Sequence, residues 1–120
     1  MTHCFAVPGG GNMFLINAAH EHPSISLKFC HHEQSAAIAA EAYYKASGRI
    51  ACCIVTSGPG ATNSLTGIVG AWLDSSPMVV LSGQVKTSDL SGGILRQKGP
   101  QEVDFIPMVK GVTLFSAQLL

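Results

Sequence analysis

The chain has 120 residues, of which 47% are apolar and 12% are charged, and its formal net charge is zero. A chain of this length forms one domain, and its apolar residues are sufficient for a core. The charge balance shows no basic excess and so argues against nucleic acid as a partner. Glycine, proline or charged residues interrupt every apolar run before it reaches the length of a membrane span, so we expect no membrane partner.

The first residues, MTHCFAVPGGG, lack the basic start and the apolar stretch of a signal peptide, so we expect a cytoplasmic protein. The small number of charged side chains leaves little polar surface for a chain of this size. We therefore expect another domain or subunit to cover part of the surface.

In the first part of the chain, strands and helices are predicted to alternate. An apolar run at 4–7 predicts a buried strand that ends at a proline and three glycines, and a helix is predicted over 12–22. A second strand is predicted over 25–30. The stretch 33–47 is rich in alanine and glutamate, has no internal glycine or proline, and is followed by Gly48. It predicts the strongest helix of the chain.

The second part begins with the same alternation and then changes character. The elements predicted here are a buried strand over 50–57, a helix over 64–76, a buried strand over 78–83, an exposed loop over 85–101, a short amphipathic turn over 102–109 and a final strand over 112–120. Between the first two of these lies GPGATN, where Pro59 stands between two glycines. That segment predicts a stiff loop.

Strands that are almost continuously apolar and alternate with helices predict a mostly parallel, doubly wound sheet. The expected fold is therefore a three-layer α/β domain with helices on both faces of the sheet. The sequence begins directly at a predicted strand and stops at or just after another. We therefore expect an incomplete domain, truncated at both ends.

The four cysteines show no metal or redox spacing. Three of them, Cys4, Cys52 and Cys53, lie in or beside apolar runs, and Cys30 ends another such run. A cysteine in that setting behaves as a small apolar residue, so we expect reduced, structural thiols. Because side chains alternate along a strand, Cys52 and Cys53 are expected on opposite faces of the sheet.

Three unusual segments follow predicted strands: PGGGN, HHE and SGPGATN. In parallel sheets, ligands bind beyond the carboxyl ends of the strands, so these segments are expected to share one rim. Glycine loops at strand–helix junctions can bind anions through backbone N–H groups. Neither loop has a dinucleotide or NTP fingerprint, however, and a tight turn explains PGGGN equally well.

Glu33 opens the strongest predicted helix and has more than one interpretation. An acid in the first turn of a helix is stabilising by about 0.3–1 kcal/mol, which is sufficient reason for its presence. A carboxyl group with little water around it at a strand end can also exchange a proton with a ligand nitrogen. The histidine-rich segments 20–22 and 31–33 lack the HExxH spacing, so we predict no metal ligands.

Four segments in this order resemble one known family: VPGGGN, HHEQSAAIAAEAYYKASGR, VTSGPGATNSLTGIVGAWLDSSPMVVLSGQ and GPQEVDFIPMV. Together they resemble the N-terminal, pyrimidine-binding domain of thiamine diphosphate enzymes, and most closely the acetolactate synthase group. The resemblance implies that Glu33 matches the glutamate that hydrogen-bonds the N1′ atom of the cofactor's aminopyrimidine and so activates the cofactor. It implies cofactor-binding roles for Val7, Pro8, Gly9, Gly10, Pro59, Asn63 and Gln101. Pro100 replaces the phenylalanine usual in acetolactate synthases.

The resemblance also implies what this chain would need from elsewhere. In the family, Mg²⁺ and the diphosphate group are held by a separate domain with a GDG…N motif, which this sequence lacks. The active site forms between two subunits, so the implied partners are thiamine diphosphate, a diphosphate-binding domain of another subunit or chain, and further copies in a homo-oligomer. FAD, which acetolactate synthases bind, is a further cofactor that the resemblance allows, although no feature of this sequence supports it.

The implied activity is that of a carboligase or decarboxylase, a transferase or lyase acting on 2-oxo acids such as pyruvate. Two alternatives remain open from the sequence. One is a non-catalytic half-domain or truncated product that pairs with a separate diphosphate domain. The other is an unrelated nucleotide-binding α/β domain that uses its glycine loops for phosphate.

Overall fold

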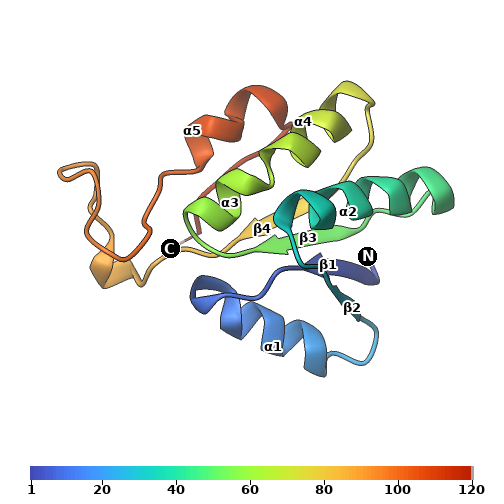
Figure 1. Ribbon diagram of the computed structural model, residues 1–120, viewed down its shortest axis with the longest axis horizontal. Helices are drawn as coiled ribbons and strands as arrows, with labels where there is room; N and C mark the ends of the chain where they lie inside the picture. Colours follow the sequence, from blue (N-terminus) through green and yellow to red (C-terminus); the bar gives the residue numbers. More distant parts are fainter. Residues whose placement is uncertain (120) are drawn as a thin grey trace.

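A four-stranded parallel sheet organises the computed structural model, which describes residues 1–119 (Figure 1). The strands are β1 (His3–Ala6), β2 (Ser26–Phe29), β3 (Cys52–Val55) and β4 (Val79–Ser82). Their order in the sheet is β2-β1-β3-β4, and all three pairings are parallel. The predicted α/β class with a parallel sheet is confirmed.

Helices cover both faces of this sheet. The helical elements of the described residues, in chain order, are η1 (Gly10–Asn12), α1 (Met13–Glu21), α2 (Glu33–Ser47), α3 (Pro59–Asn63), α4 (Leu65–Leu73), η2 (Thr87–Asp89), α5 (Ile106–Val109) and η3 (Lys110–Val112). Figure 1 shows α1 on one side of the sheet and α2, α3 and α4 on the other. The three predicted layers are therefore present.

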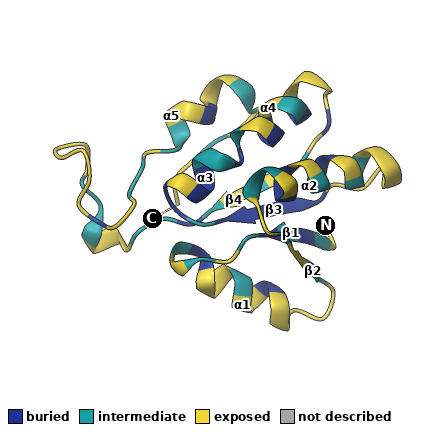
Figure 2. Cartoon of the chain, in the orientation of Figure 1, coloured by how far each residue is buried: buried dark blue, intermediate teal, exposed yellow. Residues whose placement is uncertain are grey.

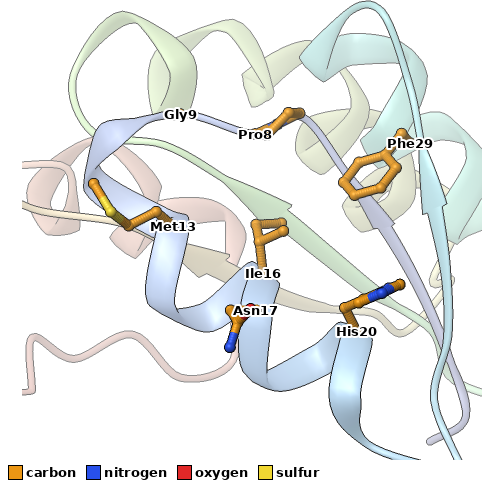
Figure 3. Close-up of a pocket in the computed structure, with 7 residues that line it drawn as sticks. All are labelled: Pro8, Gly9, Met13, Ile16, Asn17, His20 and Phe29. Carbon is orange, nitrogen blue, oxygen red and sulfur yellow. The ribbon is translucent and has the colours of Figure 1, made fainter.

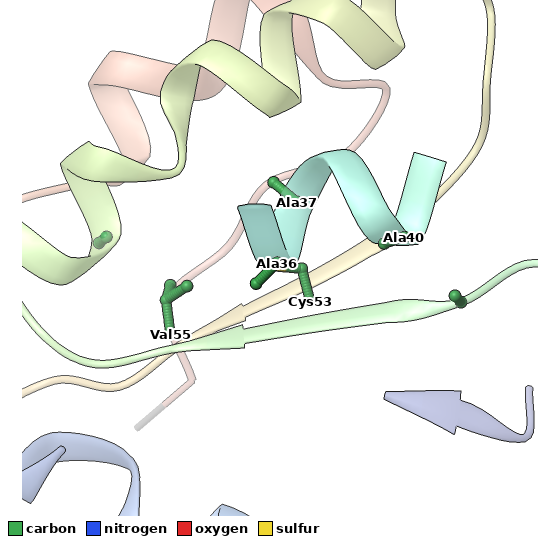
Figure 4. Packing of buried hydrophobic residues seen from close by; sticks show 7 residues of the cluster. Ala36, Ala37, Ala40, Cys53 and Val55 are labelled. Atoms are coloured by element: carbon green, nitrogen blue, oxygen red, sulfur yellow. The ribbon is translucent and has the colours of Figure 1, made fainter. Parts of the chain in front are cut away.

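The face under α2 is packed with small side chains. Ala36, Ala37 and Ala40 of α2 are buried against Cys53 and Val55 of β3 (Figure 4). Helix α4 approaches α2 equally closely: a Cβ atom on Gly67 would lie 2.5 Å from the Cβ of Ala37. The alanine-rich sequence of α2 thus serves close helix–sheet and helix–helix contact.

The opposite face carries a smaller core. Cys4, Ala6, Cys52 and Ile54 from the strands pack against Ala19 of α1. Partly buried apolar residues, Ile16, Ile25 and Leu27, complete this cluster. Cys52 and Cys53 therefore lie on opposite faces, as predicted, and all four cysteines are free thiols.

The exposed side of α1 is largely apolar. Met13, Phe14 and Leu15 are exposed there, and Phe29 at the end of β2 is exposed as well. Figure 2 shows α1 mostly in the colour of exposed residues, whereas β3 is buried along its length. No helix within residues 1–119 is both long enough and apolar enough to cross a membrane.

Two predictions for local structure were wrong. GPGATN is not a loop, because its residues Pro59–Asn63 form α3, with the proline at the first helical position where its missing N–H costs nothing. The final strand predicted over 112–120 is also not formed by the described residues: 113–119 pair with no strand, and Leu114 and Phe115 are 98% and 83% exposed. Residue 120 lies outside the described part. An apolar run becomes a strand only where a neighbouring strand and a covering layer receive it.

Candidate functional site

The carboxyl ends of β1, β2 and β3 meet at one rim, and the three predicted segments follow them there (Figure 1). The first segment is hydrogen-bonded to the residue just before the third: the N–H of Gly11 donates to Thr56 Oγ1 over 3.1 Å. Gly11 also lies against the first residue of the third segment, because a Cβ atom on Gly11 would lie 2.9 Å from Ser57 Oγ. The second and third are joined as well, since Asn63 donates to Glu33. The expected convergence of these segments is confirmed.

Thr56, the residue after β3, is packed between the two glycine segments. A Cβ atom on Gly9 would lie 2.6 Å from the Thr56 Cβ, and one on Gly60 would lie 2.5 Å from the Thr56 Cγ2. Both positions therefore require glycine so that the backbones can approach a β-branched side chain. Thr56 was not among the site residues predicted from the sequence, although it is the first polar residue after the buried run of β3.

Asn12 fixes the shape of the loop after β1. Its side chain is buried, its Oδ1 accepts the N–H of Gly9 over 2.8 Å, and its Nδ2 donates to the carbonyl of Val7 over 3.0 Å. Val7 is also tied to β3, because its N–H donates to the carbonyl of Ile54 over 3.1 Å. The PGGGN motif pointed to the loop, but the decisive residue within it is its asparagine.

Glu33 is the first residue of α2 and is half-buried. Asn63, the last residue of α3, donates through Nδ2 to Glu33 Oε2 over 2.6 Å. The other carboxyl oxygen faces backbone, since a Cβ atom on Gly60 would lie 3.6 Å from Glu33 Oε1. Within residues 1–119 both salt bridges involve Lys45, so no basic side chain of this part neutralises Glu33. One oxygen is thus held by a neutral amide and the other remains available to a ligand.

His32 extends this arrangement by one residue. Its Nε2 lies 3.3 Å from the Nδ2 of Asn63, the same nitrogen that donates to Glu33. His32, Asn63 and Glu33 therefore form one connected polar group at the rim.

Gln101 is placed beside the third segment by its backbone. Its φ of 56° lies in the left-handed region, and its carbonyl oxygen would lie 2.1 Å from a Cβ atom on Gly58. Gly58, itself at φ 58°, must therefore be a glycine. The contact brings Gln101 next to Pro59, which is exposed at the start of α3.

Glu102 holds the loop that leads to Gln101. Its carboxylate accepts backbone N–H groups of Ser91, Lys98 and Gly99 over 2.7, 2.8 and 3.2 Å. These hydrogen bonds, with that from Ser91 contributing most, lower the pKa of Glu102 to about 2. The exposed loop predicted over 85–101 is therefore closed at its base by one side chain.

Three predicted cofactor residues, Pro8, Gly9 and Gly10, follow β1 in the chain. Pro8 and Gly9 line an open hollow of about 350 Å³ on the α1 side of the sheet (Figure 3). Its other lining residues are Met13, Ile16, Asn17, His20 and Phe29. Gly10 is exposed and has no atom of the described residues within 4 Å of a Cβ built on it. Thr56 lies between this loop and the Glu33 side, because Gly9 and Gly60 both approach it.

Three backbone N–H groups of the glycine segments donate hydrogen bonds within the protein. Gly9 donates to Asn12, Gly11 donates to Thr56, and Gly60 donates to the carbonyl of Ser57 over 3.2 Å. A phosphate group needs unpaired N–H groups, so these three are not available to bind one. Residues 1–119 also contain no group of three His, Cys, Asp or Glu side chains that could hold a metal ion.

Comparison with known proteins identifies the family. Residues 1–108 match the model of the thiamine pyrophosphate enzyme, N-terminal TPP binding domain. The chain belongs to this family.

Similar curated proteins are acetolactate synthases. The probable acetolactate synthase large subunit of Methanococcus aeolicus is 46% identical over 110 residues, which are 88% of this chain and 17% of the relative. The large subunit of Lactococcus lactis is 41% identical, covering 96% of this chain and 19% of the relative. Acetolactate synthase 2 of Zea mays is 49% identical, and the match covers 68% of this chain and 13% of the relative. The chain thus spans less than a fifth of the length of these relatives.

The rim fits the pyrimidine end of thiamine pyrophosphate and not its diphosphate end. An aminopyrimidine presents ring nitrogens and a flat face, and the rim offers one free carboxyl oxygen beside glycine backbone at Gly60. A diphosphate needs cations or free N–H groups, and the glycine N–H groups named above are paired within the protein.

Proposed function

We propose that this chain forms the pyrimidine-binding half-site of an acetolactate synthase-like carboligase or decarboxylase that acts on 2-oxo acids such as pyruvate. The observation that carries the proposal is the state of the Glu33 carboxylate. It lies at the carboxyl rim of a parallel sheet, with Oε2 held by Asn63 and Oε1 facing the backbone of Gly60.

In this proposal Glu33 holds and returns a proton at Oε1. A carboxylate fixed through its other oxygen keeps one direction for proton exchange and need not reorganise during the reaction. Asn63 supplies that fixation through a neutral amide. Gly60 adds no side chain of its own between Glu33 Oε1 and Thr56.

When bound, thiamine diphosphate supplies the electron sink that permits decarboxylation of a 2-oxo acid. The residues of this chain bind and orient its pyrimidine end. Val7, Pro8, Gly9, Gly10, Pro59 and Gln101 are proposed to line the path of the cofactor around the rim, and the contact of Gln101 with Gly58 supports this for one of them.

Under this proposal the diphosphate group and Mg²⁺ are held by another domain, contributed by a second subunit or chain. That domain would also cover the rim and exclude water from Glu33, which strengthens each polar contact there. With pyruvate, Mg²⁺ and thiamine diphosphate, the isolated 120-residue chain is expected to show negligible turnover.

A chimera tests the proposal directly. This chain replaces the matching segment of the Methanococcus aeolicus relative, and acetolactate formation from pyruvate is measured. We expect an active chimera, and a loss of about 100-fold or more in kcat for Glu33→Gln, the size of a lost acid–base group. Glu21→Gln, on an exposed glutamate at the end of α1, is the matched control and should change little. An active chimera in which Glu33→Gln costs nothing refutes the proposed role.

A further inference from the structure

His32 occupies the N-cap position of α2, yet its side chain accepts no hydrogen bond from a backbone N–H group of the helix. Serine, threonine, aspartate and asparagine are the residues that usually cap a helix from this position. Their side chains are shorter than that of histidine. The His32 ring instead lies against Asn63, which is 31 residues further along the chain. At this position the histidine side chain therefore makes a contact across the rim and does not cap the helix.

The Asn63 amide nitrogen has two hydrogens and two neighbours. It lies 2.6 Å from Glu33 Oε2 and 3.3 Å from His32 Nε2. A carboxylate only accepts, so one hydrogen belongs to Glu33. The second hydrogen can be donated to His32 only if Nε2 carries no proton, which requires a neutral ring protonated at Nδ1. The geometry thus specifies one tautomer of His32.

We propose that neutral His32 is a positioning residue that orients the Asn63 amide and, through it, the Glu33 carboxylate toward the pyrimidine ring. This inference rests on the proposed function of Glu33. Without the histidine acceptor, the amide can rotate and offer its carbonyl oxygen to Glu33, and two acceptors facing each other would drive the carboxylate away. His32 itself stays outside the reacting atoms.

The charge state of the His32 ring should then control the orientation of the Asn63 amide and of the Glu33 carboxylate. A protonated ring can no longer accept from Asn63, and it would attract the Glu33 carboxylate toward itself. The other titratable groups nearby are His31 on the same segment, Cys30 after β2 and Cys53 on β3. Burial is the main cause that raises the pKa of Cys30 and brings that of Cys53 to about 12, so both thiols stay neutral. Helix α3, which provides Asn63, has no titratable side chain.

Nuclear magnetic resonance of the chain without cofactor tests this arrangement. The sequence has three asparagines, at positions 12, 17 and 63, so asparagine-selective ¹⁵N labelling gives a simple spectrum of side-chain amides. We expect the Asn63 amide to shift with pH along the same curve as the His32 ring proton. Asn12 is the internal control, because its buried amide contacts only backbone groups. The inference is overturned if the chemical shift of the Asn63 amide does not change over the pH range in which the His32 ring proton shifts.

Two variants separate positioning from simple packing. His32→Phe keeps a planar ring but removes the acceptor, and should abolish the pH-dependent shift of the Asn63 amide. His32→Gln restores an acceptor that does not titrate, and should hold the amide in its high-pH state at every pH. His32 is exposed, so neither change threatens folding. Equal spectra for the two variants contradict the proposal.

The same variants in the chimera connect the contact to catalysis. We expect His32→Phe to lower kcat about five- to tenfold, the effect of one lost hydrogen bond, while His32→Gln retains most activity and loses the acid limb of the pH profile. If Glu33→Gln is harmless in the chimera, the proposed function fails whatever the amide spectrum shows. If Glu33→Gln is damaging and both His32 variants match the unsubstituted chimera, only the positioning role fails.

Discussion

The two faces of the sheet are built differently. On the α2 side, alanines and glycines bring helices and strands into close contact, and the face is completed by α3 and α4. On the α1 side a single helix covers the sheet, and its outer surface exposes Met13, Phe14 and Leu15. The polar group of Glu33 and Asn63 belongs to the first side, and the open hollow lined by Pro8 belongs to the second.

This difference relates packing to the proposed chemistry. A carboxylate that must keep one orientation requires neighbours that cannot move, and close-packed small residues provide them. The α1 side of this chain carries no part of the Glu33 and Asn63 group, so nothing in the proposed chemistry requires rigid packing there. Its apolar surface is of the kind that other protein usually covers.

The largest expected effect comes from widening the gap between α2 and α4. Gly67→Ala places a Cβ atom 2.5 Å from that of Ala37 and 3.1 Å from the backbone nitrogen of Ile38, so the helices must separate. We expect a loss of about 1–3 kcal/mol in the free energy of unfolding, measured by urea denaturation.

Gly70→Ala, on the same helix, is the matched control for that change. Its new Cβ atom would lie 3.7 Å from Glu41 Oε2, an ordinary contact, and alanine favours the helix by up to about 1 kcal/mol. The close-packed description of this face fails if both substitutions change stability equally.

A second prediction compares the faces through two adjacent thiols. Cys52 is buried under the α1 face and Cys53 under the α2 face, and burial raises the pKa of both thiols, that of Cys53 to about 12. Labelling therefore requires local opening. In variants that keep only Cys52 or only Cys53, we expect Cys52 to react with a thiol reagent about tenfold faster than Cys53. This ratio corresponds to a difference of about 1.4 kcal/mol in the free energy of local opening. Equal rates, or faster reaction of Cys53, would show that the faces open alike.

The fold class and the shared rim could be predicted from the sequence because both follow from regular patterns. Apolar runs that alternate with helices indicate a parallel sheet, and loops after parallel strands meet at one edge. The roles of Asn12 and Thr56 could not be predicted, since they depend on which glycine backbone comes within reach once the strands are in register. The short helix α3 was missed because glycine and proline signal a turn, although proline also suits a first helical turn.

The final apolar run shows the limit of such patterns. Residues 112–119 have the composition of a strand, but the sequence could not show whether a neighbouring strand would be there to receive them. The left-handed backbone conformation of Gln101 could not be predicted from the sequence either. It follows from the close approach to Gly58 and from the contacts that Glu102 makes across its loop.

A smaller, local effect is expected at the base of the loop near the rim. A carboxylate with a lowered pKa stabilises the folded loop above its ordinary pKa, and this contribution is lost as the pH falls from about 4.5 toward 2. Amide hydrogen exchange at Ser91 and Lys98 should accelerate over that interval while the sheet stays protected. Glu102→Gln should show the faster exchange already at neutral pH; unchanged protection of these amides would contradict the assigned role.

The smallest effect is predicted on the outer surface of α1. Phe14 is 83% exposed, so Phe14→Ser removes almost no buried contact, and we expect a change within about 0.5 kcal/mol in thermal or urea unfolding. A clear loss of stability there would mean that the α1 side is packed more tightly than its exposure indicates.

The central claim is that Glu33 meets the pyrimidine ring of thiamine pyrophosphate. The most direct measurement follows the carboxyl ¹³C resonances of the four glutamates, Glu21, Glu33, Glu41 and Glu102, as thiamine pyrophosphate is added at millimolar concentration. The account predicts a shift at Glu33, a parallel shift of the Asn63 amide, and no shift at Glu21 or Glu41, with the Asn63 response lost in Glu33→Gln. A Glu33 resonance that stays fixed while other resonances respond to the added cofactor would contradict it.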